Sequence, residues 1–168
     1  ACFVDLGEEV SRSAFLALWP IGKMPVLQDT ARGETIPETS IIIEYLELHY
    51  PGAARLIPAD PDMAWRTRLR DRMFDLYVQG PMQAIVADRI RPDGGSDPAS
   101  VAAARAQLRT VYGVLEKDLA GKTWAMGEAF TLADCAAAPA LFYSDRLEPF
   151  GDDHPILAGY FERLMQRP

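Results

Sequence analysis

Residues 22–46 contain two local signals that strongly constrain how this chain folds. Pro25 follows Met24 directly before a β-prone run, where a cis X–Pro bond costs only about 0.5–1 kcal/mol. A cis bond would leave the Met24 N–H and C=O outside the sheet and available to a peptide-like ligand. Downstream, Glu38 and Thr39 stand where the sequence predicts the start of a helix. The rest of the chain is therefore interpreted around a turn at Met24 and a helix N-terminus at Glu38.

The helix expected over residues 38–49 offers a charged site at its first turn. A helix N-terminus has unpaired N–H groups and partial positive charge, so it can hold a carboxylate. The neighbouring Glu38 carboxylate can hold an amine, so the two groups together form a receptor for the zwitterionic end of an amino acid. The alternative is that Glu38 and Thr39 only cap the helix. The apolar residues expected to form the buried stripe of this helix are Ile41, Ile42, Tyr45 and Leu46.

These two segments resemble the glutathione transferase family. That family has a Lys-Val-Pro or Gln-Val-Pro turn followed by Glu-Ser-x-Ala-Ile-x-x-Tyr-Leu. The chain departs from the pattern at Thr39, where the family usually has serine, and at Trp19 before Pro20, where the family often has asparagine. The matching segments here are Lys23-Met24-Pro25 and Glu38-Thr39-Ser40-Ile41-Ile42-Ile43-Glu44-Tyr45-Leu46.

The resemblance implies specific site residues. It makes glutathione binding the favoured interpretation of four residues, which are Glu38, Thr39, Met24 and Pro25. It also implies that Lys23 lies near the second carboxylate of the ligand. Further along the chain, Asp71 resembles an acidic position that in some family members reaches the glutathione amine bound to the neighbouring subunit. An acceptor-substrate pocket is expected near Pro81, although core packing explains its three residues nearly as well: Tyr77, Met82 and Ile85.

The order of elements predicts an α+β fold in which a partial thioredoxin-like domain precedes an all-helical bundle. Residues 1–52 are expected to form strand, helix, strand, strand and helix, as in the last part of a thioredoxin-like domain. The first strand spans residues 1–6, and a helix capped by Ser11 or Ser13 follows it. We expect the missing first strand and helix, and with them the catalytic residue, to lie upstream of Ala1. The resemblance also implies a final helix beyond residue 168. The two strands of the hairpin are expected at residues 26–29 and 34–36.

A linker over residues 53–61 should lead to the helical domain of residues 62–168. Its first helix repeats Trp65, Leu69, Met73 and Leu76 at helical spacing. Pro81 should kink or divide this helix. Arginines surround the apolar repeat, and we expect them to form a solvated or subunit-facing surface paired with Asp71 and Asp75; they are Arg66, Arg68, Arg70 and Arg72.

Two further helices are expected in the second domain. The first spans residues 100–119. The second begins with Thr131 and Asp134, which have capping-box spacing, and its segment 133–140 has the small apolar composition of a helix packed on all sides. The same Thr-x-x-Asp element occurs in the helical domain of the transferase family. The residues of the first helix that are expected to face inward are Val101, Ala104, Leu108, Val111, Tyr112 and Leu115.

The charge and the cysteine content limit the classes of function that this protein can have. Acidic residues outnumber basic ones by 24 to 17, which disfavours a nucleic-acid partner. No apolar run approaches the roughly 20 residues needed to cross a bilayer. The two cysteines, Cys2 and Cys135, form no CxxC pair, so a reducing cytoplasm is the default compartment and each is best interpreted as a small core residue. Neither His49 nor His154 lies in a metal-binding context.

The resemblance implies a cytoplasmic homodimeric glutathione transferase that activates the thiol of its co-substrate glutathione for attack on an electrophilic small molecule. Three alternatives stay open on the same fold. They are a glutathione-dependent isomerase, a glutathione-dependent thiol reductase, and a non-catalytic binding or scaffold protein.

Overall fold

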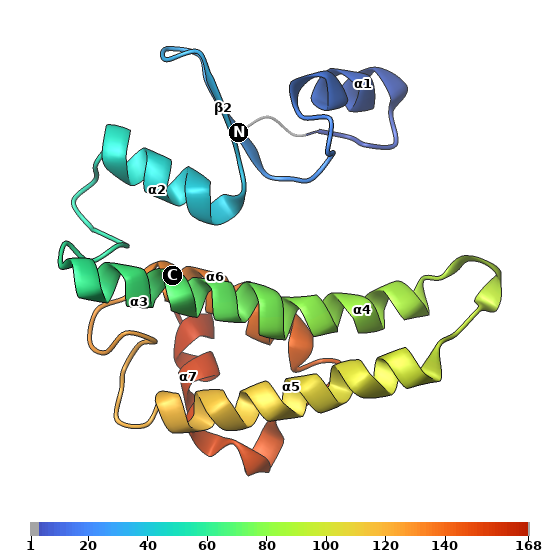
Figure 1. The fold of residues 1–168 in the computed structure, drawn as a ribbon, viewed down its shortest axis with the longest axis vertical. Coiled ribbons are helices and arrows are strands. Elements are labelled where there is room, and N and C mark those ends of the chain that lie inside the picture. The colour runs from blue at the N-terminus through green and yellow to red at the C-terminus, as the bar shows by residue number, and fades with distance from the viewer. Residues whose placement is uncertain (1–3, 168) are drawn as a thin grey trace. The chain divides into compact units, whose positions relative to one another are not determined.

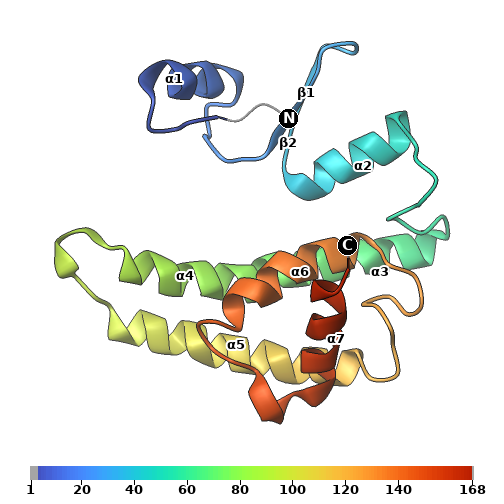
Figure 2. The same cartoon turned by 180° about the vertical axis from the view of Figure 1, so that it is seen from behind.

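The structure is a computed structural model that describes residues 4–167, without the side chain of Asp93. The chain divides into two compact units, an N-terminal unit over Ala1–Arg55 and a helical unit over Leu56–Pro168. Figure 2 labels both strands of the described chain, β1 and β2, which belong to the N-terminal unit, and Figure 1 shows the same chain from the opposite side. A hairpin-based unit therefore precedes an all-helical one, in agreement with the expected fold class.

The N-terminal unit is built on one antiparallel hairpin. Strand β1 (Val26–Asp29) pairs with β2 (Glu34–Pro37) in a register that opposes Val26 to Pro37 and Asp29 to Glu34. The turn between the strands contains Gly33 at a φ of 70°, a left-handed conformation that glycine adopts without steric cost. Helix α1 (Glu9–Leu18) precedes the hairpin, and α2 (Thr39–His49) follows it directly. The predicted hairpin is confirmed.

The strand expected over residues 1–6 is not present in the part of it that the structure describes. Residues 4–6 form irregular chain that enters a turn, and residues 1–3 lie outside the described residues. A strand needs a hydrogen-bonded neighbour, and among residues 4–167 the sheet consists of β1 and β2 alone. Local β propensity was therefore insufficient to define a strand here.

The expected cap of α1 was also wrong. The Glu8 carboxylate accepts hydrogen bonds from the backbone N–H of Val10, at 3.0 Å, and of Ser11, at 2.6 Å. Glu8 is therefore the N-cap, and both Ser11 and Ser13 lie inside the helix. A glutamate is long enough to reach back to the first turn and takes the position that a shorter hydroxyl side chain usually occupies.

Helix α2 lacks the buried stripe that its sequence predicts. None of its residues is buried; Ile41 is 52% exposed and Leu46 is 38% exposed. The helix packs on β1 and β2, and a two-stranded hairpin is too narrow to cover a full apolar face. Helical spacing gave the correct element, whereas the extent of its burial depends on the surface available beneath it.

A buried carboxylate ties α2 to the hairpin instead. Asp29, the last residue of β1, accepts hydrogen bonds from the hydroxyls of Tyr45 and Tyr50, each at 2.7 Å. It also accepts from the backbone N–H of Ala31, at 3.1 Å, and of Arg32, at 3.2 Å. The Tyr50 and Tyr45 hydrogen bonds hold the pKa of Asp29 below its ordinary value of 3.8. Desolvation and the Asp29 contact raise the pKa of Tyr45 to about 12.

This arrangement makes the N-terminal unit sensitive to acid. The pKa of Asp29 is lower in the folded state than its ordinary 3.8, so the unfolded chain binds more protons between the two values. We expect the stabilisation from Asp29 to be complete above pH 3.8 and to disappear as the pH falls through the folded pKa. Thermal unfolding between pH 2 and 6, followed by Trp19 fluorescence in a variant lacking the other two tryptophans, measures this. The Asp29→Asn variant should be less stable at neutral pH, and its stability should fall less steeply as the pH drops below 3.8. An equally steep fall in this variant would contradict the assignment.

The helical unit begins with a long rod that a π-helical segment interrupts. In Figure 1, α3 and α4 follow one another along this rod. The Gly80 N–H donates to the carbonyl of Asp75, five residues earlier, immediately before Pro81, which has no N–H to donate. The expected division at Pro81 is therefore a change of hydrogen-bond spacing. The helical elements are α3 (Pro61–Met73), η1 (Phe74–Gln79), α4 (Gly80–Arg89), η2 (Pro92–Gly94), α5 (Pro98–Asp118), α6 (Leu132–Ser144), η3 (Gly151–Asp153) and α7 (Pro155–Met165).

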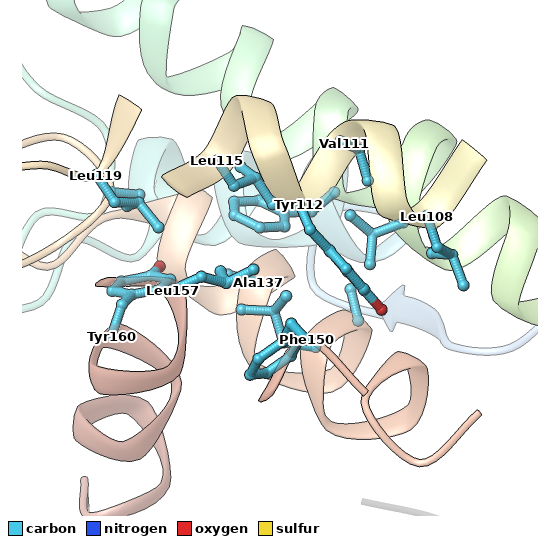
Figure 3. Packing of buried hydrophobic residues seen from close by; sticks show 14 of the residues in the cluster. Leu108, Val111, Tyr112, Leu115, Leu119, Ala137, Phe150, Leu157 and Tyr160 are labelled. Carbon is cyan, nitrogen blue, oxygen red and sulfur yellow. The ribbon is translucent and has the colours of Figure 1, made fainter. Parts of the chain in front are cut away.

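The core of this unit is formed by residues of η1, α4, α5, α6 and α7 (Figure 3). Five of the six residues of α5 expected to face inward are buried, whereas Val101 is only partly buried. Helix α5 starts at Pro98, two residues earlier than expected, because the Asp97 side chain accepts from the Ser100 N–H at 3.1 Å and caps it. The buried residues on the facing helices include Ala137, Leu157 and Tyr160.

The predicted capping box at α6 is present and fully buried. One oxygen of Asp134 accepts from the backbone N–H of Thr131 at 2.8 Å and from its hydroxyl at 3.0 Å. The other oxygen accepts from the Ala125 N–H and from the Tyr160 hydroxyl, each at 2.7 Å. The Asp134 carboxylate therefore joins the loop before α6, the start of α6 and helix α7.

Helix α6 is not packed on all sides, contrary to its composition. Pro139 is exposed, and Cys135 is only half-buried. Small side chains allow close approach wherever a neighbour exists, and here the neighbours lie on the faces that meet α3, η1 and α7.

The arginines of α3 include one expected ion pair and one that was not expected. Arg72 pairs with Asp75 at 3.5 Å, as expected, whereas Arg70 pairs with Asp118 of α5. The buried residues of α3 are Ala64, Thr67 and Asp71. The apolar repeat lies on another face and is half-exposed, with exposed fractions of 48% for Trp65 and 49% for both Leu69 and Leu76.

Candidate functional site

Five residues that the sequence singles out line one small cavity in the N-terminal unit. The cavity has a volume of about 40 Å³ and lies between the turn that precedes β1 and the start of α2. The hairpin register explains why these segments meet: Val26 opposes Pro37, so the residue before β1 and the residue after β2 lie side by side. The lining residues are Lys23, Met24, Pro25, Glu38 and Thr39.

The Met24-Pro25 bond is cis, as the sequence predicts. Both residues are exposed, and so is Lys23 beside them. The turn therefore presents its backbone and the lysine ammonium at the surface next to the first turn of α2.

Glu38 has a backbone conformation that a simple helix cap does not need. It is the only non-glycine residue with positive φ between residues 4 and 167, with φ at 69° and ψ at 120°. Such a conformation costs on the order of 1–3 kcal/mol and is concentrated at functional sites. The backbone carbonyl of Glu38 accepts the first hydrogen bond of α2 from the Ile42 N–H at 2.9 Å, whereas its carboxylate makes no capping hydrogen bond.

The unused Glu38 carboxylate distinguishes the two interpretations of this position. A capping glutamate would accept from the first N–H groups of its own helix, as Glu8 does for α1. Glu38 is instead one of the residues that line the cavity, and its side chain does not cap the N–H groups at the start of α2. The geometry therefore favours a ligand with a cationic group for Glu38 and an anionic group for the helix N-terminus.

The cavity is suited to the charged end of a ligand. A volume of about 40 Å³ holds little more than an amino-acid head group, so the remainder of any larger ligand must lie outside it. Three of its lining residues carry polar side-chain groups, which are the carboxylate of Glu38, the hydroxyl of Thr39 and the ammonium of Lys23. These charges and the hydroxyl are complementary to a zwitterion.

The structure does not bring the three expected acceptor-pocket residues together around one cavity. Met82 lines a second cavity, of about 320 Å³, in the helical unit, whereas Ile85 belongs to the buried core and Tyr77 is half-exposed outside the lining. Asp71 is buried on α3, and its role toward a ligand stays a prediction. The residues that sequence reasoning missed are Gln79, Gln83, Val86, Ala87, Ile90 and Tyr143.

Cys135 is a poor candidate nucleophile. It is half-buried in α6, and burial followed by the nearby Asp134 charge raises the pKa of its thiol, so the thiolate is disfavoured. Cys2 lies outside the described residues. Across residues 4–167, no three His, Cys, Asp or Glu side chains are grouped to hold a metal ion. Over the same range, none of the helices has both the length and the apolar character required to span a bilayer.

Two protein-family models match this chain, one in the N-terminal unit and one in the helical unit. A family model described as "Glutathione S-transferase, N-terminal domain" matches residues 2–54, and one described as "Glutathione S-transferase, C-terminal domain" matches residues 74–168. Among curated proteins, a glutathione S-transferase-like protein of Fusarium is 32% identical over 130 residues, covering 77% of this chain and 58% of that protein. The chain thus spans a little over half the length of this relative.

Other similar proteins have related descriptions. Glutathione S-transferase GstB of Escherichia coli is 24% identical, covering 92% of this chain and 74% of its own length. Maleylacetoacetate isomerase of Pseudomonas aeruginosa is 29% identical, and the match covers 86% of this chain and 65% of that protein. Among solved structures, a glutathione S-transferase from Methylobacillus flagellatus with glutathione bound has a TM-score of 0.85 at 28% identity, covering 99% of this chain and 81% of that one.

Proposed function

We propose, because this chain belongs to the glutathione S-transferase family, that it binds glutathione at the cavity between Met24 and Glu38 and transfers it to an electrophilic small molecule. One observation supports this most directly. Five of the six residues that the resemblance assigned to glutathione lie around a single cavity, and the Glu38 carboxylate is not used for capping. The bound glutathione in the Methylobacillus flagellatus structure supports the same ligand.

In this proposal each lining residue has a distinct role. Glu38 holds the γ-glutamyl ammonium, while the Thr39 hydroxyl and the N-terminus of α2 hold the adjacent carboxylate. Lys23 pairs with the glycyl carboxylate, and the Met24 backbone binds the cysteinyl part. The ligand is thereby fixed at both ends, so the direction in which its thiol projects is fixed as well.

The proposed reaction is conjugation. The glutathione thiolate sulfur forms a bond to the electrophilic carbon, the leaving group departs with its bonding electron pair, and the thiol proton passes to solvent. A thiol with a pKa near 8.5 is mostly protonated at neutral pH. Stabilisation of the thiolate is therefore the remaining chemical requirement, and none of the five lining residues is assigned to it.

Retention on immobilised glutathione tests the binding half of this proposal. We expect the full chain to be retained on glutathione-agarose and to elute with free glutathione. Failure to bind would contradict the proposal and favour a scaffold protein, because a scaffold does not require a zwitterion receptor. The proposed compartment is the cytoplasm, where glutathione is abundant and the two cysteines stay reduced.

A glutathione-dependent isomerase is the second candidate, favoured by the similarity to maleylacetoacetate isomerase. The two activities differ in what happens to glutathione. A transferase consumes one thiol per turnover, whereas an isomerase returns it unchanged. Thiol titration during the reaction of a cis-enone diacid and of an activated aryl halide therefore separates the two. A glutathione-dependent reductase would instead generate the disulfide of glutathione.

We also propose that the chain forms a two-fold homodimer through the exposed apolar face of α3 and η1. This face contains Trp65, Leu69 and Leu76, and the exposed Arg72 lies on the same segment. Apolar residues supply most association energy, while flanking charges set orientation. Light scattering at micromolar concentration in low salt should give a dimer, and Leu69→Glu should give a folded monomer. A monomeric parent protein would contradict the proposal.

A further inference from the structure

The six methionines of this chain differ in how far solvent reaches them. Met24 is the most exposed, at 56%, followed by Met165 at 43%, whereas Met82 is buried. Met73 is half-buried, and its sulfur accepts a hydrogen bond from the Arg70 guanidinium at 3.0 Å. The six are Met24, Met63, Met73, Met82, Met126 and Met165. A reagent dissolved in water therefore reaches Met24 most easily.

An exposed thioether is open to oxidation by hydroperoxides. The sulfur lone pair attacks the outer peroxide oxygen, so a sulfur–oxygen bond forms while the oxygen–oxygen bond breaks. The proton of the attacked oxygen passes to the leaving oxygen, which departs as water or as an alcohol. Sulfur is oxidised and the peroxide is reduced by the same electron pair. The product, methionine sulfoxide, is a polar side chain in place of a flexible apolar one.

Met24 also lines the small cavity of the N-terminal unit, and it is the only methionine in that lining. The lining includes Lys23 and Thr39, whose ammonium and hydroxyl groups are hydrogen-bond donors. A thioether sulfur is only a weak acceptor, whereas a sulfoxide oxygen is polar and accepts readily. Oxidation of Met24 therefore adds an acceptor to a lining whose donors suit the carboxylates of a ligand.

We propose that Met24 is a redox modification site, at which a hydroperoxide forms the sulfoxide before it oxidises the other methionines, and that this sulfoxide weakens glutathione binding. The sulfoxide oxygen competes with the ligand carboxylates for the donors of Lys23 and Thr39. Peptide methionine sulfoxide reductases reverse the change, because the sulfoxide oxygen leaves as water while two thiols become a disulfide. The loss of affinity rests on the proposed glutathione site, and the order of oxidation does not.

Peptide mass spectrometry of the full chain after brief exposure to hydrogen peroxide tests the order of oxidation. We expect the added oxygen to appear on Met24 before it appears on Met165 or Met63. A saturating concentration of S-methylglutathione should slow the reaction at Met24 and leave the rate at Met165 unchanged, because coupling between oxidation and binding is reciprocal. This ligand has no free thiol, so it does not consume the peroxide.

Calorimetry with S-methylglutathione tests the effect on binding. We expect the oxidised parent protein to bind about tenfold more weakly than the untreated one, as when one hydrogen bond to a charged group is lost. Treatment with both sulfoxide reductases, one for each sulfoxide epimer, should restore the affinity.

Two variants locate the effect, and each is compared with its own untreated sample. Met24→Leu conserves volume and has no sulfur at this position, so peroxide should not change its affinity. Met165→Leu is the matched control, because Met165 is exposed on α7 and does not line the cavity. Its affinity should fall on oxidation as much as that of the parent protein. Circular dichroism confirms that each sample is folded.

Four results would overturn the inference. They are earlier oxidation of another methionine, equal affinities of the oxidised and untreated parent protein, an equally large loss in Met24→Leu, and no recovery after reduction. Absence of binding by the untreated parent protein is a different result, because it rejects the proposed glutathione site and with it the loss of affinity. The order of oxidation is measured without ligand, so it can be rejected separately.

Discussion

Replacing Asp134 with alanine should lower the free energy of unfolding by about 3–5 kcal/mol. The Asp134 carboxylate accepts hydrogen bonds from the Ala125 N–H, the Thr131 N–H and the Tyr160 hydroxyl, all in a fully buried setting. Its removal leaves these donors without water or protein partners, and each unpaired buried donor costs about 1–3 kcal/mol. The loss therefore far exceeds the roughly 1 kcal/mol typical of an ordinary helix cap.

Urea denaturation followed by circular dichroism measures this loss, with two further variants. Tyr160→Phe removes one donor and keeps the ring, so it should cost about 1.5–3 kcal/mol. Asp152→Ala removes an exposed carboxylate from η3 and should change stability by less than about 0.5 kcal/mol. If Asp134→Ala cost no more than Asp152→Ala, the buried network would not stabilise the helical unit.

Replacing Glu38 with alanine should weaken glutathione binding at least tenfold while the protein stays folded. A hydrogen bond to a charged group contributes about 1.5–3 kcal/mol, which corresponds to roughly 10- to 150-fold in affinity. Stability should change little, because the Glu38 side chain makes no capping hydrogen bond to α2. An affinity loss combined with an unchanged unfolding midpoint separates a ligand role from a structural one.

Calorimetry with Glu34→Ala provides the matched control. Glu34 is an exposed glutamate of β2 in the same hairpin and does not line the cavity. Its replacement removes the same charge from the unit and should leave glutathione affinity unchanged. Equal affinity losses in the two variants would mean that overall charge, and not a contact to Glu38, determines binding.

Local sequence signals predicted the elements of this chain well. The turn residues at 30–33 specified the β1–β2 hairpin, and Thr131 with Asp134 specified the start of α6, because both signals depend on hydrogen bonds within a few residues. The Met24-Pro25 turn and Glu38 came together for a related reason. The hairpin register places the residues on either side of the two strands next to one another.

Burial and the lining of cavities depend on contacts between residues far apart in the sequence, so they could not be predicted in the same way. Helical spacing identified apolar faces at Ile41 and at Leu69, but whether a face is covered depends on the elements packed against it. The residues expected to form an acceptor pocket show the same limit. Met82 was correctly predicted to line a cavity, whereas Ile85 lies in the buried core. Tyr143, which also lines the cavity, belongs to α6, more than fifty residues further along the chain.

The most direct test of glutathione binding at this site is a crystal structure of the full chain with glutathione. We expect the γ-glutamyl ammonium within about 3 Å of the Glu38 carboxylate, and its carboxylate at the same distance from the Thr39 hydroxyl and the first N–H groups of α2. We expect the cysteinyl part along the Met24 backbone. Glutathione bound at another position, with Glu38 facing only solvent, would contradict the proposed site.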